Sequence, residues 1–209
     1  MKPAIDMLMQ EHRLIERVLT ALESCVQAID EGRTVERTTI RDFADFFANF
    51  ADKCHHAKEE DRLFAKLVER GFPKEGGPVG VMLMEHDQGR THVGALRRIG
   101  QGSGALTTEE RHEVVDHALA YVPLLRQHIM KEDRVLYPMA MQAIPDADFD
   151  QMMKDFEEYE ARVMGAEHQR YHALADTLAA TFRGRAFPGL LGRRPPQGNL
   201  EPAGWQRID

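Results

Sequence analysis

Apolar residues recur at steps of three and four along most of the chain, and they do not alternate with polar residues as they would in a half-buried strand. Near the N-terminus, for example, Ile5, Leu8 and Leu19 fall on one side of a helix. Because short segments join the periodic stretches, the sequence predicts an all-α fold built as an up-down four-helix bundle. The four predicted helices cover residues 4–30, 35–70, 79–99 and 108–144.

The predicted helix ends coincide with residues that stop or start helices. Gly71 ends the second helix, and a glycine-rich stretch over residues 100–104 ends the third. Thr107 and Glu110 have the spacing of a capping box, which predicts the start of the fourth helix at this point. Pro123 lies inside the fourth helix, where it predicts a kink.

The periodicity divides the chain into three parts. Residues 1–145 are predicted to form the bundle, and residues 146–182 an additional C-terminal helix, starting near residue 147, that packs on the bundle. From residue 183 to residue 209 the chain is rich in Arg, Gly and Pro and has few periodic apolar positions. This last part is predicted to be an extended or disordered tail.

Composition narrows the function classes. The net charge of -7 argues against a binder of nucleic acid or of anionic membranes, whose binding surface would be basic. No apolar run approaches the roughly 20 residues that a membrane-spanning helix needs. Cys25 and Cys54 are too few for a disulfide framework, so we expect a cytoplasmic protein. Its 10 His stand out against 2 Cys and 1 Trp.

An internal repeat orders several of these histidines. Residues 56–64 match residues 128–136 at an offset of 72, and both segments read His-x-x-x-Glu-Asp-Arg followed by two apolar residues. Residues 11–12 and 85–86 are both Glu-His and match at an offset of 74. The chain therefore reads as two helical hairpins of one design, each with a lone His followed by a His-x-x-x-Glu.

The repeat predicts a metal centre. A His and a Glu four residues apart lie on one face of a helix, and facing helices of a bundle can bring such pairs to one point. Each of these His and Glu residues lies in an apolar stripe, where an unpaired polar group is costly. A purely structural network of polar side chains is the alternative to a metal centre. His55 and Glu59 form a second such pair that points further from this stripe. The predicted metal ligands are His12, His56, Glu60, His86, His128 and Glu132.

Four imidazoles and two carboxylates suit a pair of transition-metal ions. A single zinc ion needs only about four ligands, and calcium prefers shells made of oxygen alone. Mixed nitrogen and oxygen donors favour iron or manganese. His168 and His172, in the predicted C-terminal helix, also have a ligand spacing, but no converging set of ligands accompanies them.

Helices one to four resemble the hemerythrin family, in its bacterial HHE cation-binding branch. The resemblance implies a non-haem di-iron centre, with one iron on His12 and His56 and the other on His86 and His128. It also implies that Glu60 and Glu132 bridge the irons, that oxygen or hydroxide completes the bridge, and that Mn or Zn can substitute. The residues that carry it are Glu11-His12, His55-His56-x-x-Glu59-Glu60, Glu85-His86-Asp87, and His128-x-x-x-Glu132-x-x-x-Leu136-Tyr137-Pro138.

One position departs from the family pattern. Oxygen-carrying hemerythrins have a second His four residues after the ligand of the third helix, and this chain has Arg90 there. His92 is on a different face. Water or substrate could fill the position, or a side chain such as Glu16 or Tyr121 could enter it. Glu16 could instead be an ion-pair partner at the surface, and Tyr121 could instead be a core residue.

Three functions are compatible with such a centre. The first is binding or sensing of O2, NO or iron. The second is an enzyme that decomposes peroxide or reduces oxygen, and the third is iron storage or donation. The expected partners are a small ligand such as O2, NO or peroxide, together with a second copy or another protein at the C-terminal helix. Neither nucleic acid nor a membrane is expected.

Overall fold

The computed structural model describes residues 2–183, and in this part of the chain every regular element is a helix, which confirms the predicted all-α fold. None of the described helices is long and apolar enough to cross a membrane. The predicted tail lies, from residue 184 onward, outside the described residues. In chain order the elements are α1 (Pro3–Asp30), α2 (Arg37–Phe46), η1 (Phe47–His56), η2 (Glu59–Phe64), α3 (Ala65–Glu69), α4 (Gly77–Gly100), α5 (Thr108–Lys131), η3 (Glu132–Leu136), α6 (Tyr137–Ala143), α7 (Asp146–Val163) and α8 (Glu167–Thr181).

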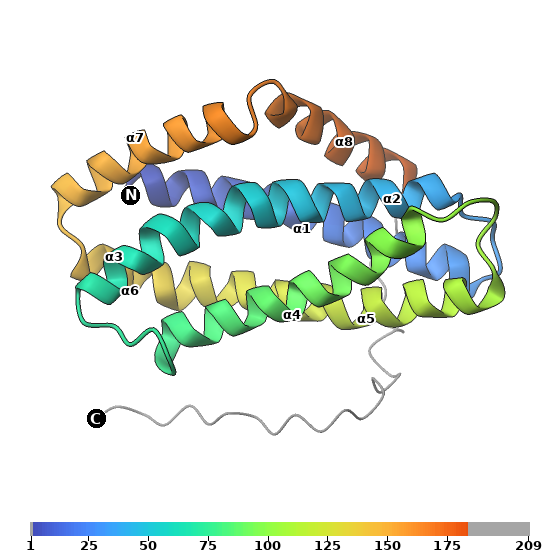
Figure 1. Cartoon of the computed structure of the whole chain (residues 1–209), viewed down its shortest axis with the longest axis horizontal. Helices are drawn as coiled ribbons and strands as arrows, with labels where there is room; N and C mark the ends of the chain where they lie inside the picture. The colour runs from blue at the N-terminus through green and yellow to red at the C-terminus, as the bar shows by residue number, and fades with distance from the viewer. Residues whose placement is uncertain (1, 184–209) are drawn as a thin grey trace.

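Four helical rods make up the bundle (Figure 1). The first rod is α1 and the third is α4, while the second runs without a break from α2 to α3 and the fourth from α5 to α6. The predicted capping box starts the fourth rod. The Thr107 hydroxyl accepts the Glu110 N–H at 3.2 Å, and the Glu110 carboxylate accepts the Thr107 N–H at 2.8 Å. Two of the unpaired donors at the helix start are satisfied in this way.

A layer of polar residues divides the hydrophobic core into two clusters. On α1, Leu8 belongs to one cluster and Leu14 to the other, and the buried His12 lies between them. The other rods change from one cluster to the other over residues 54–63, 82–93 and 129–136. The buried polar groups of all four rods therefore meet at one level of the bundle.

π-helical segments widen the second and fourth rods at this level. Along the second rod, a strict four-residue repeat stays buried: Phe43, Phe47, Ala51, His55, Glu59, Leu63 and Leu67. In an α-helix of 3.6 residues per turn, such a repeat would drift around the axis by about 40° at each step. The π-helical turns of η1 and η2 hold more residues per turn and keep this row facing the core.

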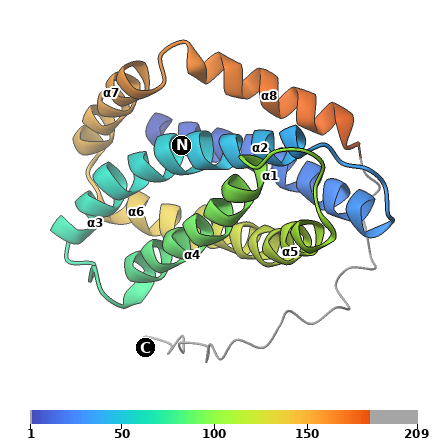
Figure 2. The same ribbon diagram turned by 45° about the vertical axis from the view of Figure 1, so that its right-hand side comes forward.

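The segment after the bundle corrects one prediction. The sequence predicts a single helix over residues 147–182, but the structure has two, α7 and α8. The reason is Gly165, which adopts a left-handed conformation with φ of +48° and donates its N–H to the carbonyl of Glu160, an arrangement that ends helices. Figures 1 and 2 show the two helices as a bent layer across α1 and α2, on the side away from α4 and α5.

Candidate metal centre

Seven polar side chains fill the layer between the two hydrophobic clusters. They are five imidazoles and two carboxylates, and none has more than 4% of its surface exposed. All four rods contribute, because the chemistry-bearing residues occupy the same level of each rod. The seven are His12, His55, His56, Glu59, His86, His128 and Glu132. Two groups can be distinguished among them by distance.

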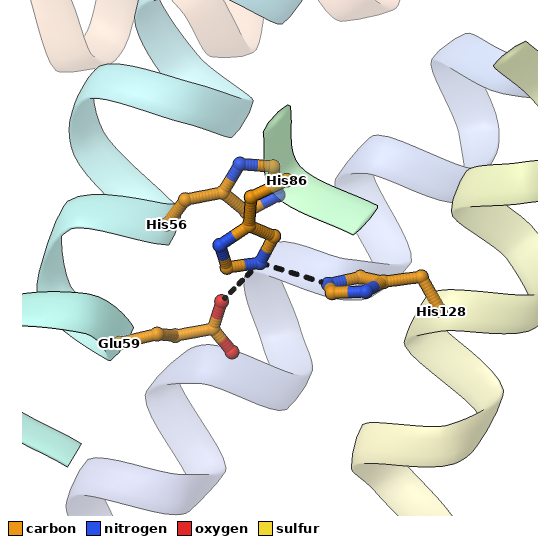
Figure 3. A group of neighbouring side chains, drawn as sticks. All are labelled: His56, Glu59, His86 and His128. Atoms are coloured by element: carbon orange, nitrogen blue, oxygen red, sulfur yellow. Dashed lines mark hydrogen bonds and ion pairs between the residues drawn. The ribbon is translucent and has the colours of Figure 1, made fainter. Parts of the chain in front are cut away.

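The three-histidine half consists of His56, Glu59, His86 and His128, which offer ligand atoms within 4.8 Å of one another. Figure 3 shows these side chains pointing toward one another from the second, third and fourth rods. The rings of His56 and His86 stack with centroids 3.8 Å apart. The Nε2 atom of His86 lies 3.0 Å from Nε2 of His128 and 3.5 Å from Oε2 of Glu59.

The two-histidine half consists of His12, His55, Glu59 and Glu132, again with ligand atoms within 4.8 Å of one another. The Nε2 atom of His12 lies 3.3 Å from Oε2 of Glu132, and Nε2 of His55 lies 3.6 Å from Oε2 of Glu59. Glu59 belongs to both halves. Glu132 also faces both, because its Oε2 is 3.2 Å from Nε2 of His128. The two carboxylates therefore stand where groups that bridge two metal ions would stand.

The outward nitrogen of every one of these imidazoles contacts a carboxylate. This fixes the ring so that Nε2 faces the centre, as is usual for histidines that bind metals. The five Nδ1 contacts are His12 to Asp133 at 2.8 Å, His55 to Glu11 at 2.9 Å, His56 to Asp52 at 3.3 Å, His86 to Glu60 at 2.6 Å, and His128 to Glu85 at 3.0 Å.

Basic side chains hold these outer carboxylates in turn. The pairs are Lys58 with Glu11, Lys131 with Glu85, Arg13 with Asp133, and Arg90 with both Asp52 and Glu60. Each imidazole is therefore oriented by a chain of charged groups that does not depend on a metal ion. Such a pre-organised outer shell lowers the cost of bringing the ligands together.

These contacts correct the alignment of the two hairpins. The side chains that play equal roles are 73 residues apart on the second and fourth rods, not 72: His55 with His128, Lys58 with Lys131, Glu59 with Glu132, and Glu60 with Asp133. Glu60 is thus the counterpart of an outer carboxylate, and its side chain is 24% exposed. The structure places Glu59, rather than the predicted Glu60, at the centre.

The sequence reasoning also left out one imidazole and left one position open. His55 lies at the centre with the four predicted histidines, so five imidazoles meet there. Arg90 is turned outward to Asp52 and Glu60, and it is His56 that stacks on His86. The two side chains considered for that position lie elsewhere. Glu16 pairs with Arg13 at the surface, and Tyr121 packs in the core against Phe47.

The described residues leave the centre electrically and sterically suited to metal ions. Four of its buried atoms make no hydrogen bond: Nε2 of His55, Oε2 of Glu59, and both carboxylate oxygens of Glu132. Buried polar atoms are nearly always satisfied, and leaving one unpaired costs about 1–3 kcal/mol. Nitrogen and oxygen atoms that face one another and have no hydrogen-bond partner can serve as ligands of a cation.

The two central carboxylates titrate very differently. Burial and the nearby charge of Glu132 raise the pKa of Glu59 well above its ordinary value. Burial also disfavours the charged form of Glu132, but the adjacent His128 and His12 hold its pKa well below its ordinary value. The Tyr137 hydroxyl donates to Glu59 Oε1 at 2.6 Å and stacks its ring on His12. Bound cations would offset the burial and the repulsion that raise the pKa of Glu59.

With this geometry established, the comparison with protein families is decisive. The family model described as the hemerythrin HHE cation binding domain matches residues 4–140. The chain belongs to this family. The match covers the four rods and the whole of the centre, and it ends before α7.

Three curated mycobacterial relatives of this hemerythrin-family chain are 23% identical to it over 158 residues. They are the uncharacterized proteins Rv1995 and MT2051 of Mycobacterium tuberculosis and Mb2018 of Mycobacterium bovis. The matched region covers 76% of this chain and 61% of each relative, so the chain spans less than two-thirds of their length. No solved structure matches the chain.

A further cluster near α7 is an ion-pair network. Glu11, Glu160 and His168 bring ligand atoms within 4.8 Å of one another. The ammonium group of Lys58 already lies between the two carboxylates and contacts both. A cation would have to displace this buried ammonium, so the cluster does not have the open donors of the central layer.

Proposed function

We propose that this chain binds two iron ions in the central layer, bridged by the carboxylates of Glu59 and Glu132. The observation that carries the proposal is the convergence of five imidazoles and these two carboxylates at one level of the bundle, with each Nδ1 atom anchored from outside. Membership of the HHE family supports cation binding at this place. In this assignment, Glu59 and His55 join the predicted ligands, and Glu60 serves as the anchor of His86.

The choice of iron follows from the donor set. Imidazole nitrogens mixed with carboxylate oxygens match iron and manganese, and they do not match the all-oxygen shells of calcium. Seven donors exceed the four of a structural zinc site. Manganese or zinc could replace iron in the same ligands, so the identity of the metal in the cell needs its own measurement.

The two halves offer different numbers of donors. His56, His86 and His128 give the three-histidine half one more imidazole than the two-histidine half has. The two-histidine half would hold its iron through His12, His55 and the two carboxylates, next to the Tyr137 hydroxyl, which lies 3.3 Å from Nε2 of His12. Iron bound there would supply electrons and a coordination position for a small ligand. The surrounding side chains exclude water and hold a phenolic proton at Tyr137.

Burial of the centre favours a binding or sensing role for O2 or NO. With at most 4% of the surface of any ligand residue exposed, no bulky substrate reaches the centre. Decomposition of peroxide, which is also small, is the alternative that the same geometry allows. A store or donor of labile iron fits less well, because the metal would have to leave a layer in which every ligand imidazole is anchored from outside. The buried free thiols of Cys25 and Cys54 agree with a reducing compartment such as the cytoplasm.

Anaerobic titration of the metal-free full chain with ferrous iron tests the proposal. We expect two irons per chain, an optical change on addition of NO or O2, and few turnovers with peroxide. Many turnovers with peroxide would favour the enzyme instead. The variant His128→Ala should lose iron, whereas His112→Ala, at an exposed position on the same rod, should keep both ions. Binding of less than one iron per chain would overturn the proposal.

A further inference from the structure

A pocket of about 550 Å³ opens between the second rod and α4, with Tyr159 of α7 at its edge. Small residues such as Ala57 and Gly94 leave the space, and charged side chains line much of it. The charged lining residues are Asp52, Lys53, Glu60, Asp61, Arg90 and Arg97. Such a lining suits a hydrated ion better than it suits an apolar molecule such as dioxygen.

The floor of the pocket is one side chain away from the three-histidine half. Asp52 contacts Nδ1 of His56, and Glu60 contacts Nδ1 of His86. The side chains of Asp52 and Glu60 are 30% and 24% exposed, and the Asp87 side chain, just outside the pocket lining, is 76% exposed. A series of carboxylates therefore leads from solvent to the imidazoles.

Arg90 closes this path. Its guanidinium group bridges Asp52 and Glu60, with N–O distances of 2.8 and 2.7 Å, and also contacts Asp87 at 2.8 Å. The Arg90 side chain is itself 37% exposed, so it can swing toward solvent without disturbing the core. Its departure would leave three carboxylates without their cation, in the position where an incoming cation would meet them.

We propose that this pocket is the route by which a divalent metal ion reaches the three-histidine half, and that Arg90 is its gate. The inference rests on the proposed metal centre and adds to it a path and a gating residue. The net charge of the chain supports a cation as the ion that enters. The whole chain has a net charge of -7, and the five Arg and two acidic residues after residue 182 contribute +3, so residues 1–182 carry -10. An acidic body attracts cations and raises their rate of encounter.

The charges at the pocket mouth provide the test. Arg97 and Asp61 line the pocket, are exposed, and contact no ligand of the metal centre. Uptake of cobalt(II) by the metal-free full chain is followed by stopped-flow absorption at low ionic strength. We expect Arg97→Gln to accelerate uptake about two- to fivefold and Asp61→Asn to slow it by a similar factor. Both effects should shrink at high salt, where these charges are screened.

Arg98→Gln is the matched control. Arg98 follows Arg97 on α4 but pairs with Glu113 and does not line the pocket, so this variant should take up cobalt at the wild-type rate. Arg90→Gln should speed both uptake and loss of the ion. If Arg97→Gln and Asp61→Asn bind as much cobalt as the wild-type chain and at the same rate, the route lies elsewhere. This result would overturn the inference about the pocket but not the metal centre. Effects of opposite sign would mean that the pocket takes an anion. Absence of cobalt binding in the wild-type chain would instead overturn the metal centre itself.

Discussion

In the two-histidine half, Asp133 contacts Nδ1 of His12, and the ring of Tyr137 stacks on the His12 ring. In the three-histidine half, Glu60 contacts Nδ1 of His86, and the ring of Phe64 stacks on the His86 ring. The parts correspond because the two hairpins repeat one design. The halves differ where the repeat is broken. His56 has Ile129 as its counterpart, and the Tyr137 hydroxyl has no equivalent on Phe64. The repeat supplies the scaffold, and these two differences make the two proposed metal positions unequal.

A second asymmetry lies outside the centre. Lys58 and Lys131 play the same part, each holding the carboxylate that anchors a ligand imidazole. The α7–α8 layer covers only one of them: the Lys58 side chain is fully buried and also meets Glu160 of α7, whereas the Lys131 side chain is 21% exposed. The added helices thus enclose the outer shell of the two-histidine half and leave the corresponding part of the other half near solvent.

The largest effect is expected from the residue that the halves share. Glu59→Gln replaces a central carboxylate by a neutral group of the same shape, so both halves should lose their metal ion. Glu60→Gln should keep two ions and weaken binding by about 10- to 100-fold, the usual cost of losing the partner of a metal-bound histidine. Metal content per chain after gel filtration, together with titration, measures both.

Folding should survive Glu59→Gln. Burial and Glu132 already disfavour the charged form of this side chain, and the amide removes that cost. An unchanged helical circular-dichroism signal is the control. Should Glu60→Gln lose both ions while Glu59→Gln keeps them, the assignment of the two residues would have to be exchanged.

The next effect isolates one half. His56→Ile gives the second rod the residue that the fourth rod has at the equivalent position, Ile129. The three-histidine half should then lose its ion, while the two-histidine half keeps its own, so iron content should fall from two to one per chain. Retention of two tightly bound ions would show that His56 is only a packing neighbour of His86.

A stability comparison sharpens the second asymmetry. Lys58→Met leaves the buried Glu11 without its cation, removes one partner of the partly exposed Glu160, and should lower the free energy of unfolding by about 3–5 kcal/mol. Lys131→Met removes a partly exposed pair and should cost about 1 kcal/mol or less. Denaturant unfolding of the metal-free variants gives both values. Equal costs would mean that the α7–α8 layer does not change the environment of Lys58.

Much of the fold could be predicted from the sequence, because hydrophobic periodicity and helix-ending residues are local signals. The capping box at Thr107 is one such signal, and the structure contains it. The break at Gly165 was missed because an isolated glycine inside a periodic stretch is often tolerated. Only the hydrogen bonding of its N–H to Glu160 shows that the helix ends there.

At the centre, the residue types could be predicted, but their register could not. A helical wheel with α-helical spacing, centred on His56, selects Glu60 as a residue on the same face. In the structure, the four-residue repeat that contains His55 and Glu59 faces the centre instead. The signal was present in the four-residue repeat from Phe43 to Leu67, which is compatible with one buried face only if the helix is widened. The widening arises from packing between rods, and single-residue patterns do not report it.

The smallest expected effect is a count of protons released on metal binding. Burial disfavours the charged form of His128, but the carboxylates of Glu132 and Glu85 raise its pKa to about 9 in the metal-free chain. His56 and His86, whose pKa values are lowered, are already neutral at pH 7. Ligation of His128 should therefore expel a proton at pH 7.

The protonation of His128 should consequently make metal affinity rise with pH up to about 9. Above that pH its contribution should level off, because the imidazole is already neutral. Calorimetric titration in two buffers of different ionisation enthalpy gives the number of protons released. Glu85→Gln removes one cause of the raised pKa of His128. In this variant, the release of the His128 proton on metal binding should therefore disappear at a lower pH than in the wild-type chain. Metal binding at pH 7 without proton release would contradict the raised pKa of His128 in the metal-free chain.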